Sequence, residues 1–278
     1  MNIHFTNEKL FDTLNDNTIV KIRVGSHMYG LDNKNSDIDY LSIYLENYDN
    51  RNSFMWEHHQ LQYKKNNIDF NFTTLQSFIR NALTGDSTIN FEVLHSEDLK
   101  NSKLSWLYER RNDFRNYNII KSYLGIAKRD HKFWIKDTNN FKNHTSETNK
   151  KLAHFVRGVI FAKNLFDNNF SLDLSKTTTF KICGYNDLEL LDRIKNGILD
   201  YSFSELVKFF WILMEDTRSA LNIMLHNREI YSFMDPFKLE KLDSLVMDFV
   251  YGYVEGDISY VEYNQLFYEV MENGLNYN

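Results

Sequence analysis

One segment near the N-terminus constrains this chain more than any other, residues 21–41, which read KIRVGSHMYGLDNKNSDIDYL. A β-like run ends in Gly25-Ser26, a short linker follows, and a second β-like run opens with Asp37 and Asp39. Because side chains alternate between the two faces of a strand, both carboxylates project from the same face. Two carboxylates on one strand face, beside a Gly-Ser turn, suit a divalent metal and a triphosphate.

Each half of this segment also has a simpler interpretation. A glycine at a strand end lets the backbone approach a ligand closely, and a helix start behind it would offer N–H groups to phosphate. Most Gly-Ser pairs are nevertheless plain turns. An isolated Asp-x-Asp is more often two solvated aspartates on an exposed strand edge. Here Asp37 follows Ser26 by eleven residues, with β-like runs on both sides, and this context favours metal binding.

Asp69 is the candidate for a third carboxylate. It lies in the run Ile68-Asp69-Phe70-Asn71-Phe72, whose apolar residues share one face of a strand. Asp69 therefore faces the other way, as Asp37 and Asp39 would if the strands are neighbours. Its expected role is metal ligand and general base for an acceptor hydroxyl, and the alternative is a solvent-facing strand aspartate.

The hydrophobic periodicity predicts an α+β protein, with a small mixed sheet followed by a helical part. We expect two domains, residues 1–98 with the sheet and the catalytic groups, and residues 99–278 with the helices. The predicted strands span 18–24, 37–45, 61–64 and 68–73, the last two joined as a hairpin around 65–67. The predicted helices span 7–15, 75–83 ended by Gly85, 104–137, 147–167, 186–196, 203–227 and 236–251.

Composition and charge narrow the class of protein. The chain is 42% hydrophobic and 25% charged, as in ordinary soluble proteins. The lone Cys183 allows no internal disulfide, and no apolar run approaches the roughly 18 residues of a membrane span, so we expect a cytoplasmic protein without a membrane partner. Residues 103–163 hold 14 Lys and Arg against 5 Asp and Glu. This basic stretch could face phosphates, although solvated helix faces explain it equally well.

The motifs together resemble a known family. Gly25 to Leu31, GSHMYGL, and Asn35 to Asp39, NSDID, resemble the predicted nucleotidyltransferases linked with RNA-repair pathways, which are also found in phages and belong to the DNA polymerase β-type superfamily. Residues 85–94, the K-x-x-H-x-x-R pattern from Lys151 and the element at 194–197 are also similar to this family. The resemblance covers roughly residues 18–225. It departs at Lys195, where arginine is common, and in the acidic, aromatic tail after about residue 228.

The resemblance implies a reaction and a set of site residues. The reaction is the metal-dependent transfer of a nucleoside monophosphate from an NTP to an acceptor hydroxyl, with release of pyrophosphate. Asp37, Asp39 and Asp69 would be catalytic and would bind Mg²⁺ or Mn²⁺. The residues implied to hold the nucleotide are Gly25, Ser26, His27, Tyr29, Ser36, Lys151, His154 and Arg157.

Several alternatives stay open. His27 serves equally well as a structural residue of the loop, and for Tyr29 packing under the loop is favoured over stacking on a base or ribose. The pattern from Lys151 to Arg157 also has a structural interpretation on its helix. The acceptor fits an RNA end such as that of a tRNA, and a protein or small-molecule hydroxyl is an alternative. The rival class is a non-catalytic nucleotide-binding module, of a regulatory or toxin–antitoxin kind. The preferred NTP and the oligomeric state are not specified by the sequence.

Overall fold

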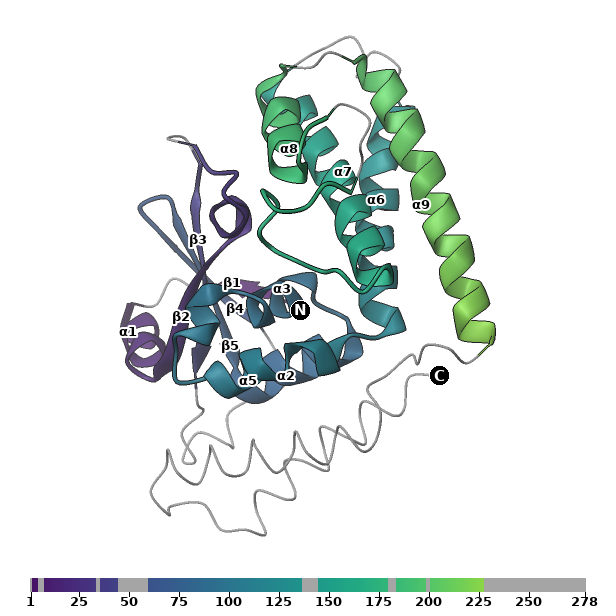
Figure 1. Cartoon of the computed structure of the whole chain (residues 1–278). Coiled ribbons are helices and arrows are strands. Elements are labelled where there is room, and N and C mark those ends of the chain that lie inside the picture. Colours follow the sequence, from purple (N-terminus) through teal and green to yellow (C-terminus); the bar gives the residue numbers. More distant parts are fainter. Residues whose placement is uncertain are drawn as a thin grey trace. The chain divides into compact units, whose positions relative to one another are not determined.

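The computed structural model describes residues 2–4, 8–33, 36–44, 60–136, 145–179, 184–198 and 201–227. These residues form two compact units. The sheet unit contains the described residues of 2–25 and 36–114, and the helical unit contains those of 26–33 and 115–227. The predicted α+β class is confirmed, with a mixed sheet and then helices (Figure 1). The predicted helix 236–251 and Cys183 lie outside the described residues, and the domain boundary at residue 98 stays a prediction.

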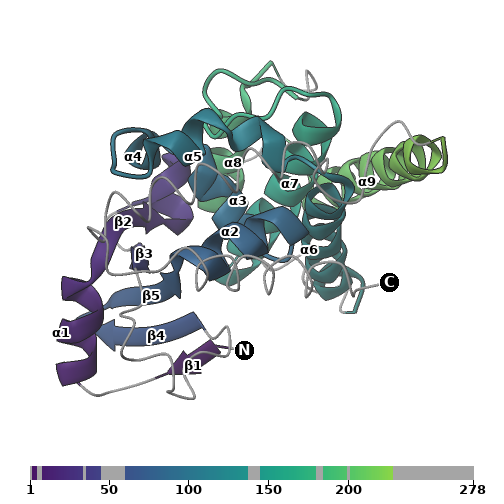
Figure 2. The same cartoon turned by 90° about the horizontal axis from the view of Figure 1, so that it is seen from below.

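The sheet unit is built on five strands in the order β1-β4-β5-β3-β2 (Figures 1 and 2). β2 pairs antiparallel with β3, β3 parallel with β5, β5 antiparallel with β4, and β4 parallel with β1. The strands span Asn2–His4 (β1), Thr18–Val24 (β2), Ile38–Tyr44 (β3), Gln60–Lys65 (β4) and Ile68–Thr74 (β5). Four of them follow the predicted strands to within one residue at each end, and the short β1 was not foreseen.

The β4–β5 hairpin turns on two asparagines. Asn66 and Asn67 both have positive φ, 53° and 61°, as the two central residues of a type I′ turn require. This two-residue turn sets Lys65 opposite Ile68 and Lys64 opposite Asp69. The predicted turn at 65–67 would have shifted this register by one residue.

The helix α1 (Glu8–Asp16) packs its apolar side against one face of the sheet. Phe11 stacks on Tyr63 at 4.5 Å between ring centroids and meets Phe70 edge-on at 5.0 Å. The buried residues of this layer are Leu14, Tyr44, Leu61, Tyr63, Phe70 and Phe72. Because Ile68 and Phe70 also join this layer, Asp69 between them projects from the opposite face.

Helices also follow the sheet within the same unit. In α2 (Leu75–Thr84), the Thr74 side chain caps the first turn and Gly85 ends the helix with φ 74°, as predicted for this glycine. Next come α3 (Thr88–Leu94) and α4 (Glu97–Lys100). Residues 89–94 were interpreted only as a short apolar run, and the Ser87 cap starts a helix there.

The single helix predicted over 104–137 is wrong. Three segments occupy this range, α5 (Ser105–Glu109), the 3₁₀ segment η4 (Arg111–Phe114) and α6 (Tyr117–Lys136). The buried Asn116 accepts a hydrogen bond from the Ile119 amide at 3.1 Å and thereby caps a new helix. The apolar periodicity runs through the break, so it could not reveal the capping residue.

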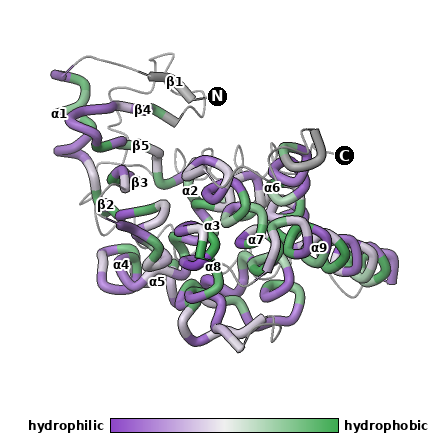
Figure 3. Tube along the Cα trace, turned by 90° about the horizontal axis from the view of Figure 1, so that it is seen from above, coloured by the Kyte–Doolittle hydropathy of each residue, from purple (hydrophilic) through white to green (hydrophobic). Residues whose placement is uncertain are grey.

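The helical unit packs α6 against α7 (Ser146–Phe166), with α8 (Asp187–Asn196) and α9 (Phe203–His226) against α7. At Gly158 a Cβ atom would lie 3.3 Å from Ala127 Cβ, so the two long helices meet closely there. Polar and apolar residues alternate around α9 (Figure 3). Among the described helices, none combines the length and the hydropathy needed to cross a bilayer.

Candidate active site

Four residues in register form a row across four strands: Val24 on β2, Asp39 on β3, Asp69 on β5 and Lys64 on β4. We call it the acidic row, after the two carboxylates at its centre. Directly paired residues on adjacent strands project from the same sheet face, with Cβ atoms about 5 Å apart. The structure therefore places Asp39 and Asp69 side by side, as the sequence predicted. Both lie at the second residue of their parallel strands, at one edge of the sheet.

Gly25 brings the backbone onto this row. Its φ of +71° lies in the left-handed region, and a Cβ atom there would sit 2.8 Å from Asp39 Oδ2. A side chain at this position would clash with the carboxylate. The close approach expected for this glycine is thus an approach to Asp39. The 3₁₀ segment η1 (Gly25–Tyr29) follows, and its five residues form no longer helix at which phosphate-binding N–H groups could gather.

Asp37 and Ser36 precede the row. Asp37 is exposed, and β3 begins one residue later, at Ile38, so Asp37 has no paired residue on a neighbouring strand. Ser36 is half-buried. Their sequence positions keep both near the start of β3, where Asp39 lies.

Lys64 supplies a positive charge to the row. Its Nζ lies 3.1 Å from Asp69 Oδ1 and donates a hydrogen bond to Oδ2 at 3.4 Å. This hydrogen bond and the charge of Asp69 raise the pKa of Lys64, and the charges of Asp37 and Asp39 act in the same direction. Lys64 is absent from the residues predicted above, because the register of the hairpin decides whether it faces Asp69. A two-residue turn at Asn66-Asn67 sets that register.

The carboxylates of the acidic row are candidate ligands of a divalent metal. Carboxylate oxygens are the hard ligands that Mg²⁺ and Mn²⁺ take, and the Lys64 ammonium shows that a cation already rests against Asp69. Within the described ranges, no three His, Cys, Asp or Glu side chains converge closely enough to hold one ion. The donor chemistry thus fits a divalent metal, although Asp37, Asp39 and Asp69 do not form a closed coordination shell in this structure.

The residues after Ser26 belong to the helical unit. Tyr29 is buried, and its ring lies 5.6 Å from the Phe161 ring and 4.4 Å from the guanidinium carbon of Arg157. The Leu31 carbonyl accepts a hydrogen bond from the Lys195 ammonium. The GSHMYGL segment is therefore held by α7 and α8, and Tyr29 packs as a core residue of this unit.

His27 lies in the same segment. Its Nε2 is 3.7 Å from Asp32 Oδ2, and its side chain is 11% exposed. Its Nδ1 is buried with no hydrogen-bond partner in the described part of the chain. This geometry fits a residue that shapes the loop.

Four cations act electrostatically on His154 of α7, and we call them the basic cluster: Arg129 on α6 and Lys150, Lys151 and Arg157 on α7. Burial, and after it the charges of these four residues, lower the pKa of His154 to about 3. His154 is therefore neutral at physiological pH and adds no positive charge of its own. Burial lowers the pKa of Lys195, and the charge of the nearby Lys150 acts in the same direction. Such an excess of positive charge attracts polyanions.

Comparison with known proteins concerns both the acidic row and the basic cluster. The sequence model of one family, described as the RNA repair pathway DNA polymerase beta family or RlaP, matches residues 6–172, more than half of the chain. The chain belongs to the RlaP family. This confirms the resemblance derived from the motifs. The match includes Gly25, the acidic row and the stretch from Lys151 to Arg157, whereas Lys195 lies beyond it.

A solved structure is also similar to this RlaP chain. It is a nucleotidyltransferase-like protein from Exiguobacterium sibiricum, with 10% sequence identity over 78% of this chain and 73% of that one, at a TM-score of 0.28. At these values the match adds no detail to the site. No curated protein matches the chain.

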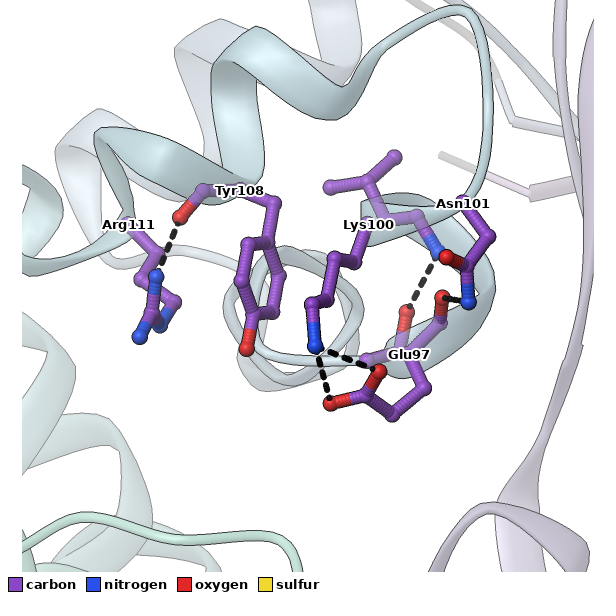
Figure 4. A network of polar contacts seen from close by, with 7 residues as sticks. Glu97, Lys100, Asn101, Tyr108 and Arg111 are labelled. Carbon is purple, nitrogen blue, oxygen red and sulfur yellow. Dashed lines mark hydrogen bonds and ion pairs between the residues drawn. The ribbon is translucent and has the colours of Figure 1, made fainter.

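The basic stretch of this RlaP chain is divided between the two units, since residues 103–114 belong to the sheet unit and 115–163 to the helical unit. In the first part, the Tyr108 ring lies between Arg111, 4.0 Å away, and Lys100, 5.7 Å away (Figure 4). Arg111 also donates to the Tyr108 carbonyl at 2.7 Å, and Lys100 pairs with Glu97 at 3.0 Å. Of these two cations, only Arg111 belongs to the basic stretch, and it has structural partners within the sheet unit.

Proposed function

We propose that this RlaP protein transfers a nucleoside monophosphate from an NTP to the 3′-hydroxyl of an RNA. The observation that carries the proposal is the register of Asp39 and Asp69, two carboxylates side by side with the Gly25 backbone packed on one of them. Membership of a family described by RNA repair and DNA polymerase β supports the transferase class and the RNA acceptor.

In the proposed reaction, the acceptor oxygen forms a bond to the α-phosphorus, and the bond between the α-phosphorus and the bridging oxygen breaks. Pyrophosphate leaves, and the proton of the hydroxyl passes to the Asp69 carboxylate. Asp37 and Asp39, with Asp69, would hold Mg²⁺ or Mn²⁺. When bound, the metal supplies positive charge to the phosphate oxygens as negative charge develops on them.

The nucleotide has further proposed partners beside the carboxylates. Gly25 offers a backbone without a side chain, and Ser26 and Ser36 offer hydroxyls to the phosphates. The assignment of Lys151, His154 and Arg157 to the nucleotide rests on the family resemblance alone. His27 and Tyr29 keep the loop in shape, as their packing in the helical unit supports.

The test is a transfer assay with α-³²P-labelled ATP, CTP, GTP and UTP, Mg²⁺ and total RNA, resolved on a denaturing gel. We expect labelled RNA from the wild type. We expect its loss with RNA whose 3′ end has been oxidised by periodate, because the acceptor hydroxyl is then destroyed. Asp39→Asn should abolish labelling. The control Asp98→Asn removes an exposed carboxylate on α4 and should leave labelling unchanged.

Other results would reassign the activity. A labelled protein band would make a protein hydroxyl the acceptor, and a labelled small product would make it a metabolite. NTP binding without pyrophosphate release, unchanged in Asp39→Asn, would contradict the transferase and favour the non-catalytic module.

A further inference from the structure

We infer that Lys64 is a tethered counter-cation of the acidic row, which competes with the divalent metal for Asp69 and moves away when the metal binds. The inference rests on the proposed function only for the presence of a divalent metal at these carboxylates. It assigns a task to a residue outside the motifs of the family resemblance, and it concerns the state of the site before any substrate arrives.

The geometry places Lys64 at the end of the row. Its residue pair on β5 is Asp69, whose own neighbour on β3 is Asp39. The ammonium contacts both Asp69 oxygens, at 3.1 and 3.4 Å, and it also experiences the charges of Asp37 and Asp39. The lysine thus contacts one carboxylate and lies within the electrostatic range of two more.

Charge balance explains why such a lysine would compete with a metal. Asp39 and Asp69, paired on adjacent strands, repel each other, and each favours a nearby cation. Without a metal, Lys64 offsets part of this repulsion at Asp69. A divalent ion bound to the same Asp69 oxygens would bring two more positive charges beside the ammonium. The two cations repel each other, so binding of the metal at Asp69 and the Lys64–Asp69 ion pair are mutually unfavourable.

The position of Lys64 also permits its departure. Its side chain is 61% exposed, and that of Asp69 is 39% exposed. The ammonium is carried on a flexible four-carbon stem, so it can swing into solvent while the backbone pairing of β4 and β5 is kept. The next pair of β4 and β5 on the same face is neutral, Gln62 donating to Asn71 at 2.8 Å. Of these two pairs, only that of Lys64 brings a cation to the row.

The chain provides a matched control on the same strand. Lys65 follows Lys64, projects from the opposite face and pairs with Glu8 of α1 at 3.0 Å. The two lysines have similar exposure, 61% and 51%, and each holds one exposed ion pair. They differ in whether the partner belongs to the acidic row.

The experiment measures Mn²⁺ binding to the full chain without nucleotide, by the electron paramagnetic resonance signal of free Mn²⁺. We expect Lys64→Met to bind Mn²⁺ about twofold to fivefold more tightly than the wild type, as expected for loss of one exposed charge contact. Lys65→Met should bind like the wild type. The gain should shrink at high salt, where exposed charges are screened. Tighter binding cannot result from a variant that fails to fold.

The outcomes separate this inference from the proposed function. Equal or weaker Mn²⁺ binding by Lys64→Met, with wild-type binding that is lost in Asp39→Asn, overturns the role of Lys64 and leaves the metal site intact. If the wild type binds no Mn²⁺, both the inference and the proposed metal site fail. An equal gain in Lys64→Met and Lys65→Met would indicate a general charge effect and would also overturn the inference.

Discussion

The guanidinium carbon of Arg157 lies 4.4 Å from the centroid of the buried Tyr29 ring. These residues come from two motifs far apart in the sequence, GSHMYGL and the K-x-x-H-x-x-R pattern of α7. Their contact gives a physical reason for both motifs to occur in one chain, because each supplies half of a cation–π pair.

The first prediction concerns this pair. Tyr29→Leu should destabilise the protein by about 2–4 kcal/mol, because it removes a buried ring and its cation–π partner. Tyr29→Phe keeps the ring and should cost about 1 kcal/mol or less. Urea unfolding followed by circular dichroism measures both. Equal losses for the two variants would show that the ring face does not carry the interaction.

The second prediction concerns Gly25. Gly25→Ala should abolish nucleotide transfer, because the new methyl group would meet Asp39 Oδ2 at 2.8 Å. It should also lower the free energy of unfolding by about 2–4 kcal/mol, since left-handed backbone costs alanine about 1 kcal/mol before any clash. The control is Gly184→Ala, whose φ is +74° but whose Cβ would meet nothing within 4 Å. A similar loss of stability in both variants would show that the clash with Asp39 adds nothing to the cost of the left-handed backbone.

The third prediction concerns the stability of the protein in acid. Burial lowers the pKa of His95 to about 4 from its usual 6.5. Below pH 6.5 the unfolded chain binds a proton at this residue and the folded chain does not, so stability is full above pH 6.5 and falls as the pH drops to 4. The loss attributable to His95 is about 3 kcal/mol over this window. Urea unfolding at pH 7 and pH 5 should show a smaller loss for His95→Gln, and an unchanged loss would contradict this assignment.

The fourth prediction concerns His154. With a pKa of about 3, its ring stays neutral throughout the range in which transfer is measured. Its NMR ring signals should therefore not shift between pH 5 and pH 8. Transfer by His154→Gln, which keeps a hydrogen-bonding side chain, should follow the wild-type pH profile. A His154 titration near pH 6.5 would contradict the lowered pKa.

Local patterns predicted much of the sheet unit. The alternation in Ile68-Asp69-Phe70 placed Asp69 on the face away from the α1 layer, and β-branched residues marked β2. Gly85 ended α2 as its sequence position suggested. These features depend on neighbours a few residues away, and a sequence displays such neighbours directly.

Features that depend on register or tertiary packing were missed. Whether Lys64 faces Asp69 depends on a turn of two residues, which is set by the left-handed backbone of Asn66 and Asn67. The break before α6 depends on one cap at Asn116, hidden inside a continuous apolar pattern. Tyr29 packs on Phe161, which lies far away in the sequence, and the spacing of residues within a helix or strand does not predict such a contact.

The loop after Gly25 has a consequence for dissecting this protein. Residues 26–33 follow directly from β2 of the sheet unit, yet Tyr29 and Leu31 are buried residues of the helical unit. A recombinant fragment that starts at residue 115 would lack both side chains and expose the part of α7 against which Tyr29 packs. Residues 115–227 are therefore not a complete helical unit by themselves, and a fusion protein that contains this unit must also include residues 26–33.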